Sequence, residues 1–161
     1  MLVTFLRHAT AEERRFDQTD AERALTDKGL KQIKRVAELC QAHELSPERL
    51  LSSPLLRARQ TADELHRRLP GCPPPEIVDW LGLDSGARTV ARRLRDLADQ
   101  GARDVWLVGH EPDFSEAVGL LLGCPVGNLS IKKASLTRLE LDAADGEGRG
   151  RLLWSVPVKL G

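Results

Sequence analysis

Two arginines and two histidines of this chain have the side-chain types that phosphoryl transfer needs, and each follows a segment with a strong structural signal. Arg7 and His8 stand directly after one apolar run, and His110 follows a second. Arg57 lies one turn into a helix expected after Ser53. An imidazole can attack phosphorus or donate a proton while guanidinium groups hold anionic oxygens. An isolated Arg–His pair is weak evidence, so the inference depends on all four side chains meeting in one pocket.

The elements that would position these side chains alternate between strands and helices. Short apolar runs rich in β-formers indicate strands, and apolar residues at helical spacing indicate helices. The expected strands are 2–6, 49–52, 76–78, 105–108, 136–141 and 152–156, the last two joined by a glycine-rich turn at 142–150, and the expected helices are 26–43, 53–69, one around 90–97, and 113–122. This alternation predicts one α/β domain over residues 1–161 with a mostly parallel sheet and a C-terminal antiparallel hairpin.

Parallel strands would bring the polar residues to one place. In an open α/β sheet the carboxyl ends of parallel strands lie at one edge, where ligands bind, and the four side chains all follow such ends. Ser53 followed by Pro54 also indicates an N-cap and a first helical residue, which would direct a helix N-terminus at a bound anion. The expected pocket holds two imidazoles, two guanidiniums and a helix N-terminus, a combination suited to a phosphoryl group.

Composition narrows the classes of protein to consider. The 161 residues carry 24 Lys and Arg and 24 Asp and Glu, a formal net charge of zero, so no bulk field attracts nucleic acid or a membrane surface. Three widely spaced cysteines form no C-x-x-C motif, which argues against a disulfide scaffold and a zinc cluster. The N-terminal apolar run is too short for a signal peptide, and no run is long enough to span a bilayer. We expect a cytoplasmic protein that binds neither nucleic acid nor membrane; its oligomeric state is left open.

Four motifs resemble those of a known enzyme family. In chain order they are Arg7-His8-Ala9-Thr10, Glu22-Arg23-Ala24-Leu25-Thr26, Ser52-Ser53-Pro54-Leu55-Leu56-Arg57-Ala58-Arg59-Gln60-Thr61-Ala62 and Val108-Gly109-His110-Glu111-Pro112. The set, in this order over the whole chain, is similar to the histidine phosphatase superfamily. The small size, the Arg-x-Leu-Thr signature and Lys132-Lys133-Ala134 resemble its SixA-type phosphohistidine phosphatases. The resemblance implies a three-layer α/β/α sandwich of the phosphoglycerate mutase-like type.

The resemblance also implies a role for each polar residue. His8 would be the nucleophile that forms a covalent phosphohistidine, and Arg7 and Arg57 would hold the phosphoryl oxygens. His110 would donate to the same oxygens, and Arg23 would complete the pocket from the irregular segment 11–25. The attacking imidazole must be neutral, and neighbouring guanidiniums lower the pKa of a histidine. No cofactor and no metal are implied, since side chains supply the cationic charge.

The general acid and the substrate are left open by the residues. Many members of the superfamily protonate the leaving oxygen with a carboxylic acid, for which Asp84, Glu111 and Glu12 compete here. Imidazole leaves a P–N bond more readily than an alkoxide leaves a P–O bond, so the lack of a clear acid favours phosphohistidine as the substrate. The chain also lacks long insertions that could enclose a small substrate, which leaves room for a protruding side chain of a phosphoprotein. The alternatives are a phosphatase for small phosphomonoesters or nucleotides, a non-catalytic phosphate-binding module, and a metal site that lacks an evident third ligand beside His8 and His110.

Overall fold

The computed structural model describes residues 1–124, 127, 129–142 and 150–158, and its centre is a six-stranded sheet with the order β3-β2-β4-β1-β5-β6. Strands β1 to β4 are parallel, whereas β5 pairs antiparallel with both β1 and β6. The bounds are Leu2–Arg7 for β1, Arg49–Ser52 for β2, Glu76–Ile77 for β3, Asp104–Gly109 for β4, Leu136–Leu141 for β5 and Gly150–Val156 for β6. The predicted sheet and hairpin are confirmed, although β6 begins two residues earlier than expected. Residues 143–149 of the predicted turn lie outside the described residues.

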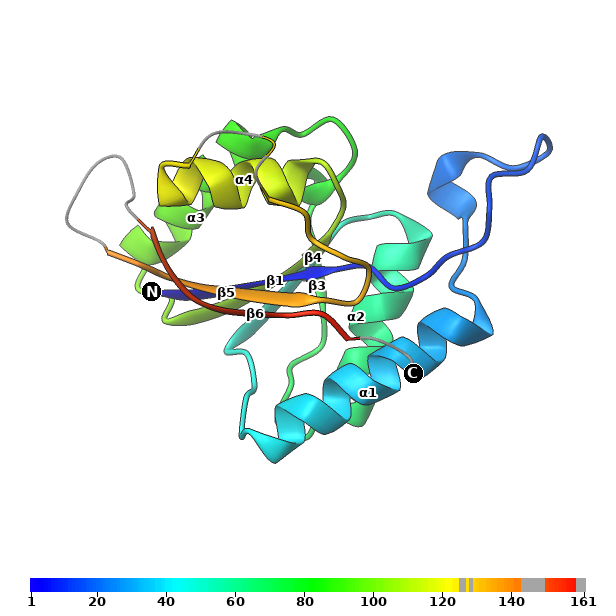
Figure 1. Cartoon of the computed structure of the whole chain (residues 1–161), viewed down its shortest axis with the longest axis horizontal. Coiled ribbons are helices and arrows are strands. Elements are labelled where there is room, and N and C mark those ends of the chain that lie inside the picture. Colours follow the sequence, from blue (N-terminus) through cyan, green and yellow to red (C-terminus); the bar gives the residue numbers. More distant parts are fainter. Residues whose placement is uncertain (125–126, 128, 143–149, 159–161) are drawn as a thin grey trace.

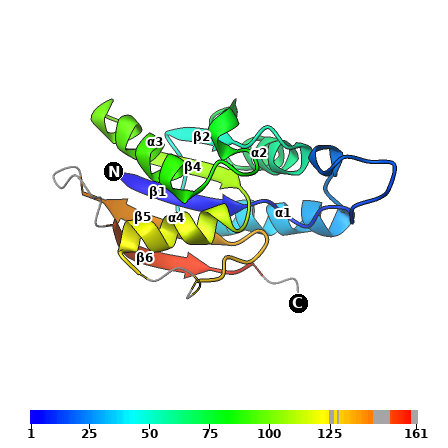
Figure 2. The ribbon, with the colours of Figure 1, turned by 90° about the horizontal axis from the view of Figure 1, so that it is seen from above.

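Helices cover both faces of the sheet. Their bounds are Asp27–Ala42 for α1, Leu56–Arg68 for α2, Ala87–Asp99 for α3 and Asp113–Leu122 for α4, with short 3-10 helices at Asp20–Glu22 (η1) and Asp79–Leu81 (η2). Figure 1 shows α1 and α2 below the sheet and α3 and α4 above it, and Figure 2 looks down from the side of α3 and α4. The buried apolar residues form two clusters, one on each face, as the predicted three-layer sandwich requires. In the part of the chain that the structure describes, no helix has the length and apolar character needed to cross a membrane.

The central strands β1 and β4 are apolar on both faces. Successive side chains of a strand point to opposite sides of the sheet. Phe5 of β1 therefore packs in the cluster beside α3 and α4, and Leu6 packs in the cluster beside α1 and α2. In β4, Leu107 likewise packs in the cluster beside α3 and α4, and Trp106 packs in the cluster beside α1 and α2. Because helices cover both faces, side chains that meet a ligand are confined to the strand ends.

The register of the parallel strands aligns their carboxyl ends at one edge. Strand β4 lies between β1 and β2, and Arg7 of β1 lies opposite Gly109 of β4. Backbone hydrogen bonds continue this alignment beyond the strands, from His8 N to Gly109 O at 3.0 Å and from Ser53 N to Val108 O at 2.9 Å. The expected meeting of three strand ends is therefore found.

The N-caps predicted for two helices have different outcomes. Thr26 caps α1 as expected, its hydroxyl accepting from a backbone amide of the first turn at 3.2 Å. The prediction that Ser53 caps α2 is wrong, because the helix begins at Leu56 with Leu55 in the cap position. The backbone of Ser53 still follows the sheet, and its hydroxyl lies 2.7 Å from an imidazole nitrogen of His110. The same hydroxyl accepts from Leu55 N at 3.3 Å, so it links the start of α2 to a neighbouring strand end.

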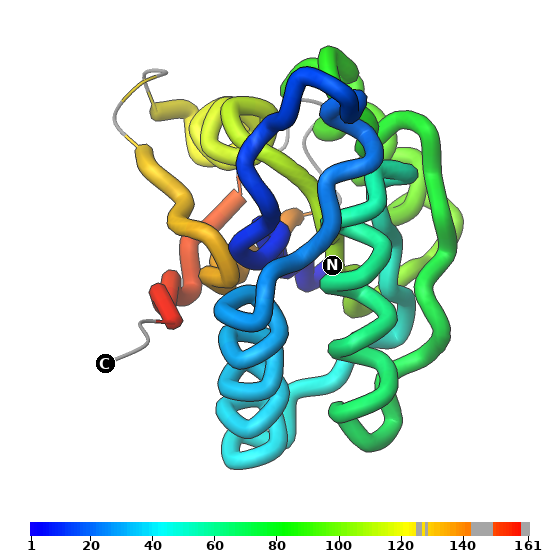
Figure 3. Tube along the Cα trace, turned by 90° about the vertical axis from the view of Figure 1, so that its right-hand side faces the viewer, coloured from blue at the N-terminus to red at the C-terminus, as the bar shows by residue number. Residues whose placement is uncertain are grey.

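The segment 11–25 projects beyond the carboxyl edge of the strands (Figure 1, Figure 3). Its two ends meet in a β-bridge between Ala11 and Leu25. Within it, Thr19 and Glu22 form a capping box around η1. Leu25 N donates to the side chain of Gln60 in α2 at 2.7 Å, which ties the base of the segment to the domain. The segment predicted as an irregular loop therefore has a defined local structure.

Candidate active site

His8, immediately after β1, has a fixed tautomer. The residue is only 6% exposed, and its Nδ1 lies 2.8 Å from the carbonyl oxygen of Ala9. A carbonyl oxygen can only accept, so Nδ1 carries the hydrogen and Nε2 has the lone pair. Burial, with smaller effects from His110, Arg57 and Arg7, lowers the pKa of His8 to about 3. The imidazole is therefore neutral at physiological pH, as a nucleophile must be.

Arg57, in the first turn of α2, lies beside the unprotonated nitrogen of His8. Its Nε donates to His8 Nε2 at 3.3 Å, and the residue is 4% exposed. Its terminal nitrogens donate to Asp20, Nη1 to the backbone oxygen at 2.7 Å and Nη2 to the carboxylate at 2.9 Å. Thr61 links this helix turn to β1, because its hydroxyl donates to Arg57 O and accepts from Ala9 N. A buried guanidinium is thus held next to the predicted nucleophile.

Arg23 reaches the same carboxylate from the segment 11–25. Its Nη1 donates to Asp20 at 2.8 Å, and its Nε donates to Glu12 O at 2.6 Å. Asp20 therefore bridges Arg23 and Arg57 with one carboxylate oxygen on each. Burial acts to raise the pKa of Asp20, but hydrogen bonds from the two guanidiniums hold it below its usual value. Two of the arginines predicted to bind phosphate are thereby placed side by side.

Arg7 is held by the turn that precedes β5. Its Nη1 donates to Ile131 O at 2.8 Å, and Ala134 N donates to Arg7 O at 3.0 Å. Among the residues that the structure describes, Arg7 Nε is buried without a hydrogen-bond partner. Burial also lowers the pKa of Arg7, against the opposing charge of Glu111. An unpaired buried donor is unfavourable unless a ligand accepts from it, so Arg7 Nε fits an anion site.

His110, immediately after β4, has one bound and one free ring nitrogen. Its Nε2 lies 2.7 Å from the hydroxyl of Ser53, and its Nδ1 is buried with no partner in the described part of the chain. When the hydroxyl of Ser53 donates to Nε2, that nitrogen is the unprotonated one. The ring hydrogen of His110 is then on Nδ1, where it is available to a ligand. Burial, followed by the charge of Arg57, lowers the pKa of His110 to about 3. The rings of His8 and His110 lie 5.1 Å apart, so two neutral imidazoles share the site.

Gly109 lets α4 fold tightly back after His110. A Cβ at position 109 would lie 2.6 Å from the ring of Phe114 in the first turn of α4. That ring packs edge-on against Phe5 of β1, with centroids 5.1 Å apart. A side chain at this position would push α4 off the sheet. The glycine thereby fixes the backbone from which the imidazole of His110 projects.

The chain matches known proteins in sequence. A family model described as the histidine phosphatase superfamily (branch 1) matches residues 3–82, which include His8, Arg23 and Arg57. An uncharacterized protein of Picosynechococcus sp. is 35% identical over 145 residues, which cover 89% of this chain and 87% of that relative. The chain belongs to the histidine phosphatase superfamily.

Solved structures of histidine phosphatases have the same fold. The protein histidine phosphatase SixA complexed with tungstate has a TM-score of 0.85 at 25% identity, and the match covers 96% of each chain. A mycobacterial glucosyl-3-phosphoglycerate phosphatase complexed with VO3 has a TM-score of 0.75 at 22% identity, covering 95% of this chain and 97% of its own. The first match confirms the predicted SixA-type resemblance, and the second shows a shared fold alone. The chain is accordingly a phosphoric hydrolase with the histidine phosphatase fold.

The histidine phosphatase site also contains residues that the motifs did not single out. Asp20 stands three residues before Arg23, a spacing that permits a local ion pair. The same carboxylate also meets Arg57, which is 37 residues away, and no local pattern reports that contact. Ser53 lies within one of the motifs, yet its role as the partner of His110 depends on the pairing of β2 with β4. These contacts follow from the fold and not from sequence spacing.

The three carboxylic acids considered for leaving-group protonation have different surroundings. Glu12 is bound within the segment 11–25, where its carboxylate accepts from Gln18 Nε2 at 3.3 Å. Asp84 is exposed in the loop before α3. Glu111 is half-buried next to His110, and burial raises its pKa despite a hydrogen bond from Ser115 and the charge of Arg7. A raised pKa favours the protonated form that a general acid needs, so Glu111 is the best placed of the three.

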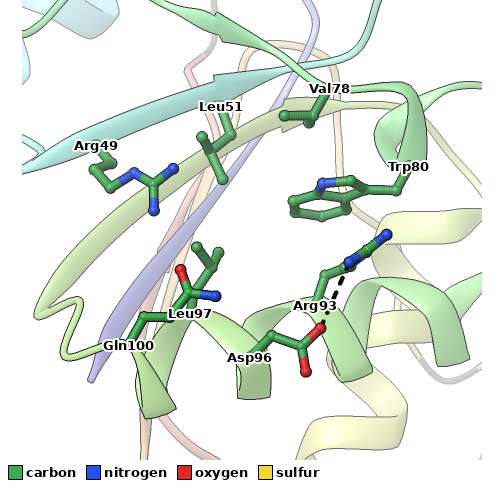
Figure 4. Close-up of a pocket in the computed structure, with 8 residues that line it drawn as sticks. All are labelled: Arg49, Leu51, Val78, Trp80, Arg93, Asp96, Leu97 and Gln100. Carbon is green, nitrogen blue, oxygen red and sulfur yellow. Dashed lines mark ion pairs between the residues drawn. The ribbon is translucent and has the colours of Figure 1, made fainter.

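A separate hollow of about 110 Å³ lies between β2, η2 and α3 (Figure 4). Its lining consists of Arg49, Leu51, Val78, Trp80, Arg93, Asp96, Leu97 and Gln100, and none of the five predicted site residues contributes to it. Arg49 forms a two-point ion pair with Glu76, and Arg93 lies 3.7 Å from Asp96. Because its charges are matched within the protein, this hollow is a poor site for a phosphoryl group. Within the described ranges, no group of three or more His, Cys, Asp or Glu side chains is placed to hold a metal ion.

Proposed function

We propose that the protein is a metal-independent phosphatase that removes the phosphoryl group from a phosphohistidine of another protein, with His8 as the nucleophile. The observation that carries the proposal is the neutral imidazole of His8, whose Nε2 lone pair faces the guanidinium of Arg57 at 3.3 Å. The hydrogen bond from Nδ1 to Ala9 O fixes this tautomer before substrate binds. A neutral imidazole among phosphate-binding cations is what nucleophilic attack on phosphorus requires.

In the first step, His8 Nε2 attacks phosphorus opposite the bond that breaks. A P–N bond to His8 forms as the substrate's P–N bond breaks, and the electron pair of the broken bond stays on the leaving imidazole, which takes up a proton. Positive charge develops on the ring of His8, and this strengthens the hydrogen bond from Nδ1 to Ala9 O. One P–N bond replaces another, and the bond to His8 is the more easily broken because the pKa of its imidazole is low.

In the second step, water attacks the phosphorus of the covalent intermediate. A P–O bond forms, the P–N bond to His8 breaks, and its electron pair returns to Nε2. The water gives its proton to the carboxylate of Glu111, the proposed donor of the first step, and inorganic phosphate leaves. The low pKa of His8 makes its neutral imidazole a good leaving group here, and two easier displacements replace one difficult one.

Three guanidiniums and one imidazole would hold the phosphoryl oxygens. Arg7, Arg57 and Arg23 each donate one N–H to a backbone carbonyl oxygen, which fixes the direction of the others. Arg7 adds its unpaired Nε, and His110 adds the hydrogen on Nδ1. Each charge-assisted hydrogen bond of this kind contributes about 1.5–3 kcal/mol. The unpaired donors of Arg7 and His110 are oriented in advance, and such donors stabilise the transition state without reorganisation.

Glu111 is the proposed proton donor to the leaving group. Its carboxyl is half-buried, lies close enough to Arg7 to interact with its charge, and has a pKa raised by burial. A leaving alkoxide depends on such a donor, whereas a leaving imidazole is a weaker base and depends on it less. The contribution of Glu111 therefore differs between the two candidate classes of substrate.

The substrate class is the finer part of the proposal. Phosphohistidine in a protein is supported by the likeness to SixA, which extends over 96% of both chains. A small phosphomonoester is the second candidate, because a glucosyl-3-phosphoglycerate phosphatase shares the fold over 95% of this chain. A non-catalytic phosphate-binding module is disfavoured by the neutral imidazole of His8, because phosphate binding alone does not need an unprotonated Nε2.

Turnover on a protein phosphohistidine and on a panel of phosphomonoesters tests the proposal. We expect kcat/KM to be at least about tenfold higher for the phosphohistidine protein, a difference in transition-state binding of about 1.4 kcal/mol. His8→Ala should abolish activity on both classes, and EDTA should leave activity unchanged. Higher kcat/KM on an ester would overturn the substrate class, and loss of activity with EDTA would overturn the metal-independent mechanism.

A further inference from the structure

Asp20 occupies the place where phosphoryl oxygens are expected. Its two carboxylate oxygens accept from different guanidiniums, Oδ1 from Arg23 Nη1 at 2.8 Å and Oδ2 from Arg57 Nη2 at 2.9 Å. Its backbone oxygen accepts from Arg57 Nη1 at 2.7 Å. An anion that bridges two guanidiniums in this way has the charge and the geometry with which a phosphoryl group binds arginine.

We propose that Asp20 is an internal competitor of the phosphoryl group and thereby sets the affinity of the site for substrate and for the phosphate product. The inference rests on the proposed function, in which Arg23 and Arg57 hold phosphoryl oxygens. The side chain of Asp20 is 29% exposed and that of Arg57 is 4% exposed. An incoming anion therefore displaces the carboxylate toward solvent, while the buried guanidinium stays in the pocket.

The displacement also changes the surroundings of the nucleophile. Arg57 Nε donates to His8 Nε2, the atom that must attack phosphorus. Asp20 holds the other end of the same guanidinium through both terminal nitrogens. Once an anion replaces the carboxylate, Arg57 Nη2 can bind a phosphoryl oxygen while Nη1 keeps its bond to Asp20 O. The long hydrogen bond from Nε then gives way as the lone pair of His8 attacks phosphorus. Binding of the anion and exposure of the nucleophile are thus coupled.

The backbone around Asp20 is held by bonds that do not involve its carboxylate. Thr19 donates to the carboxylate of Glu22 from its backbone nitrogen at 2.9 Å and from its hydroxyl at 2.7 Å. Arg23 Nε donates to Glu12 O at 2.6 Å. The side chain of Asp20 can therefore exchange with a ligand while the segment 11–25 keeps its fold.

Competition of this kind lowers the affinity for every anion by the same factor, because each must displace the same carboxylate. A dianionic phosphoryl group gains more from the two guanidiniums than a monoanion does. The dianionic phosphoryl group therefore still binds in competition with Asp20, whereas monoanions bind too weakly to displace the carboxylate. After hydrolysis, the returning carboxylate of Asp20 displaces inorganic phosphate. The residue thereby limits product inhibition.

Titration calorimetry with inorganic phosphate at mildly alkaline pH tests the role of Asp20. Asp20→Asn and Asp20→Ala remove the competing charge. Asp17→Asn is the matched control, because it removes one negative charge from a side chain in the same segment that is 74% exposed. We expect the phosphate Kd to fall about tenfold in both Asp20 variants, as the fraction of open sites rises, and to stay unchanged in the control. The inhibition constant of phosphate in turnover should fall in parallel.

A phosphate Kd that rises, or that falls by less than about threefold, in Asp20→Asn would overturn the inference and show that Asp20 positions the arginines instead. Circular dichroism checks that the variants are folded, and the isosteric Asn variant decides if the Ala variant is not. Arg57→Ala separates this inference from the proposed function. If Arg57→Ala binds phosphate as tightly as the wild type, phosphate does not use this pocket and both fail. If Arg57→Ala weakens binding while the Asp20 variants do not tighten it, the role of Asp20 alone fails.

Discussion

Replacement of Ser53 by alanine tests whether its hydroxyl fixes the tautomer of His110. Ser53 is fully buried, and its Oγ lies 2.7 Å from His110 Nε2. The substitution leaves a second buried ring nitrogen without a partner, since Nδ1 already has none among the described residues. Losing a hydrogen bond and leaving a buried polar group unsatisfied costs about 1–3 kcal/mol. We expect the free energy of unfolding to fall by that amount, and kcat/KM to fall roughly 10- to 100-fold if the same term is lost in the transition state.

The tautomer of His110 is the measurement that distinguishes a positioning role of Ser53 from a contribution to stability alone. Nitrogen NMR of the histidine side chains should place the hydrogen of His110 on Nδ1 in the wild type and on a mixture of both nitrogens in Ser53→Ala. Ser52→Ala is the matched control, because Ser52 is equally buried and donates to the backbone oxygen of Ser53 at 3.0 Å. The control should lose stability without a change of tautomer. An unaltered tautomer together with unaltered kcat/KM in Ser53→Ala would show that the hydroxyl of Ser53 does not set the protonation of His110.

Three further perturbations have expected outcomes. Arg57→Lys keeps the charge but loses the fork of donors, so kcat/KM should fall roughly 10²- to 10³-fold, while Arg59→Lys on the exposed face of the same helix should have no effect. Glu111→Gln should remove the alkaline limb of the pH–rate profile and reduce turnover of phosphomonoesters more than that of phosphohistidine; equal losses on both would count against an acid role. The pKa values of His8 and His110 are lowered from 6.5 to about 3 in the folded protein, so the unfolded state binds more protons between these values. The contribution of these two histidines to stability should therefore be fully present above about pH 6.5 and be lost as the pH drops toward 3. A denaturation series without a fall in stability over that range would contradict the burial of neutral imidazoles.

The fold and most of the site could be predicted because their signals are local. Continuous apolar runs end just before Arg7 and shortly before His110, and they identify buried parallel strands. Because the carboxyl ends of such strands lie at one edge of the sheet, the polar residues that follow them are predicted to meet. Thr26 was correctly identified as an N-cap because a capping bond spans only the first turn. Four motifs in fixed order then specified the family, which no single motif does.

What the sequence could not specify depends on contacts between distant segments. Asp20 bridges Arg23 and Arg57 only because η1 lies against the first turn of α2. Ser53 has the local pattern of an N-cap, and its hydroxyl accepts from Leu55 N, but the helix begins only at Leu56. The pairing of β2 with β4 gives the same hydroxyl a second partner, His110. In both cases tertiary contacts decide between local alternatives that the chain allows.

If His8 accepts the phosphoryl group, a covalent intermediate can be trapped on the protein. The protein is mixed with a radiolabelled phosphohistidine protein, quenched rapidly with alkali and examined for label on the chain. We predict a label that survives alkali, is lost in acid, is absent in His8→Ala and persists in Ser52→Ala. A label that survives acid, or one that remains in His8→Ala, would show that His8 is not the residue that accepts the phosphoryl group.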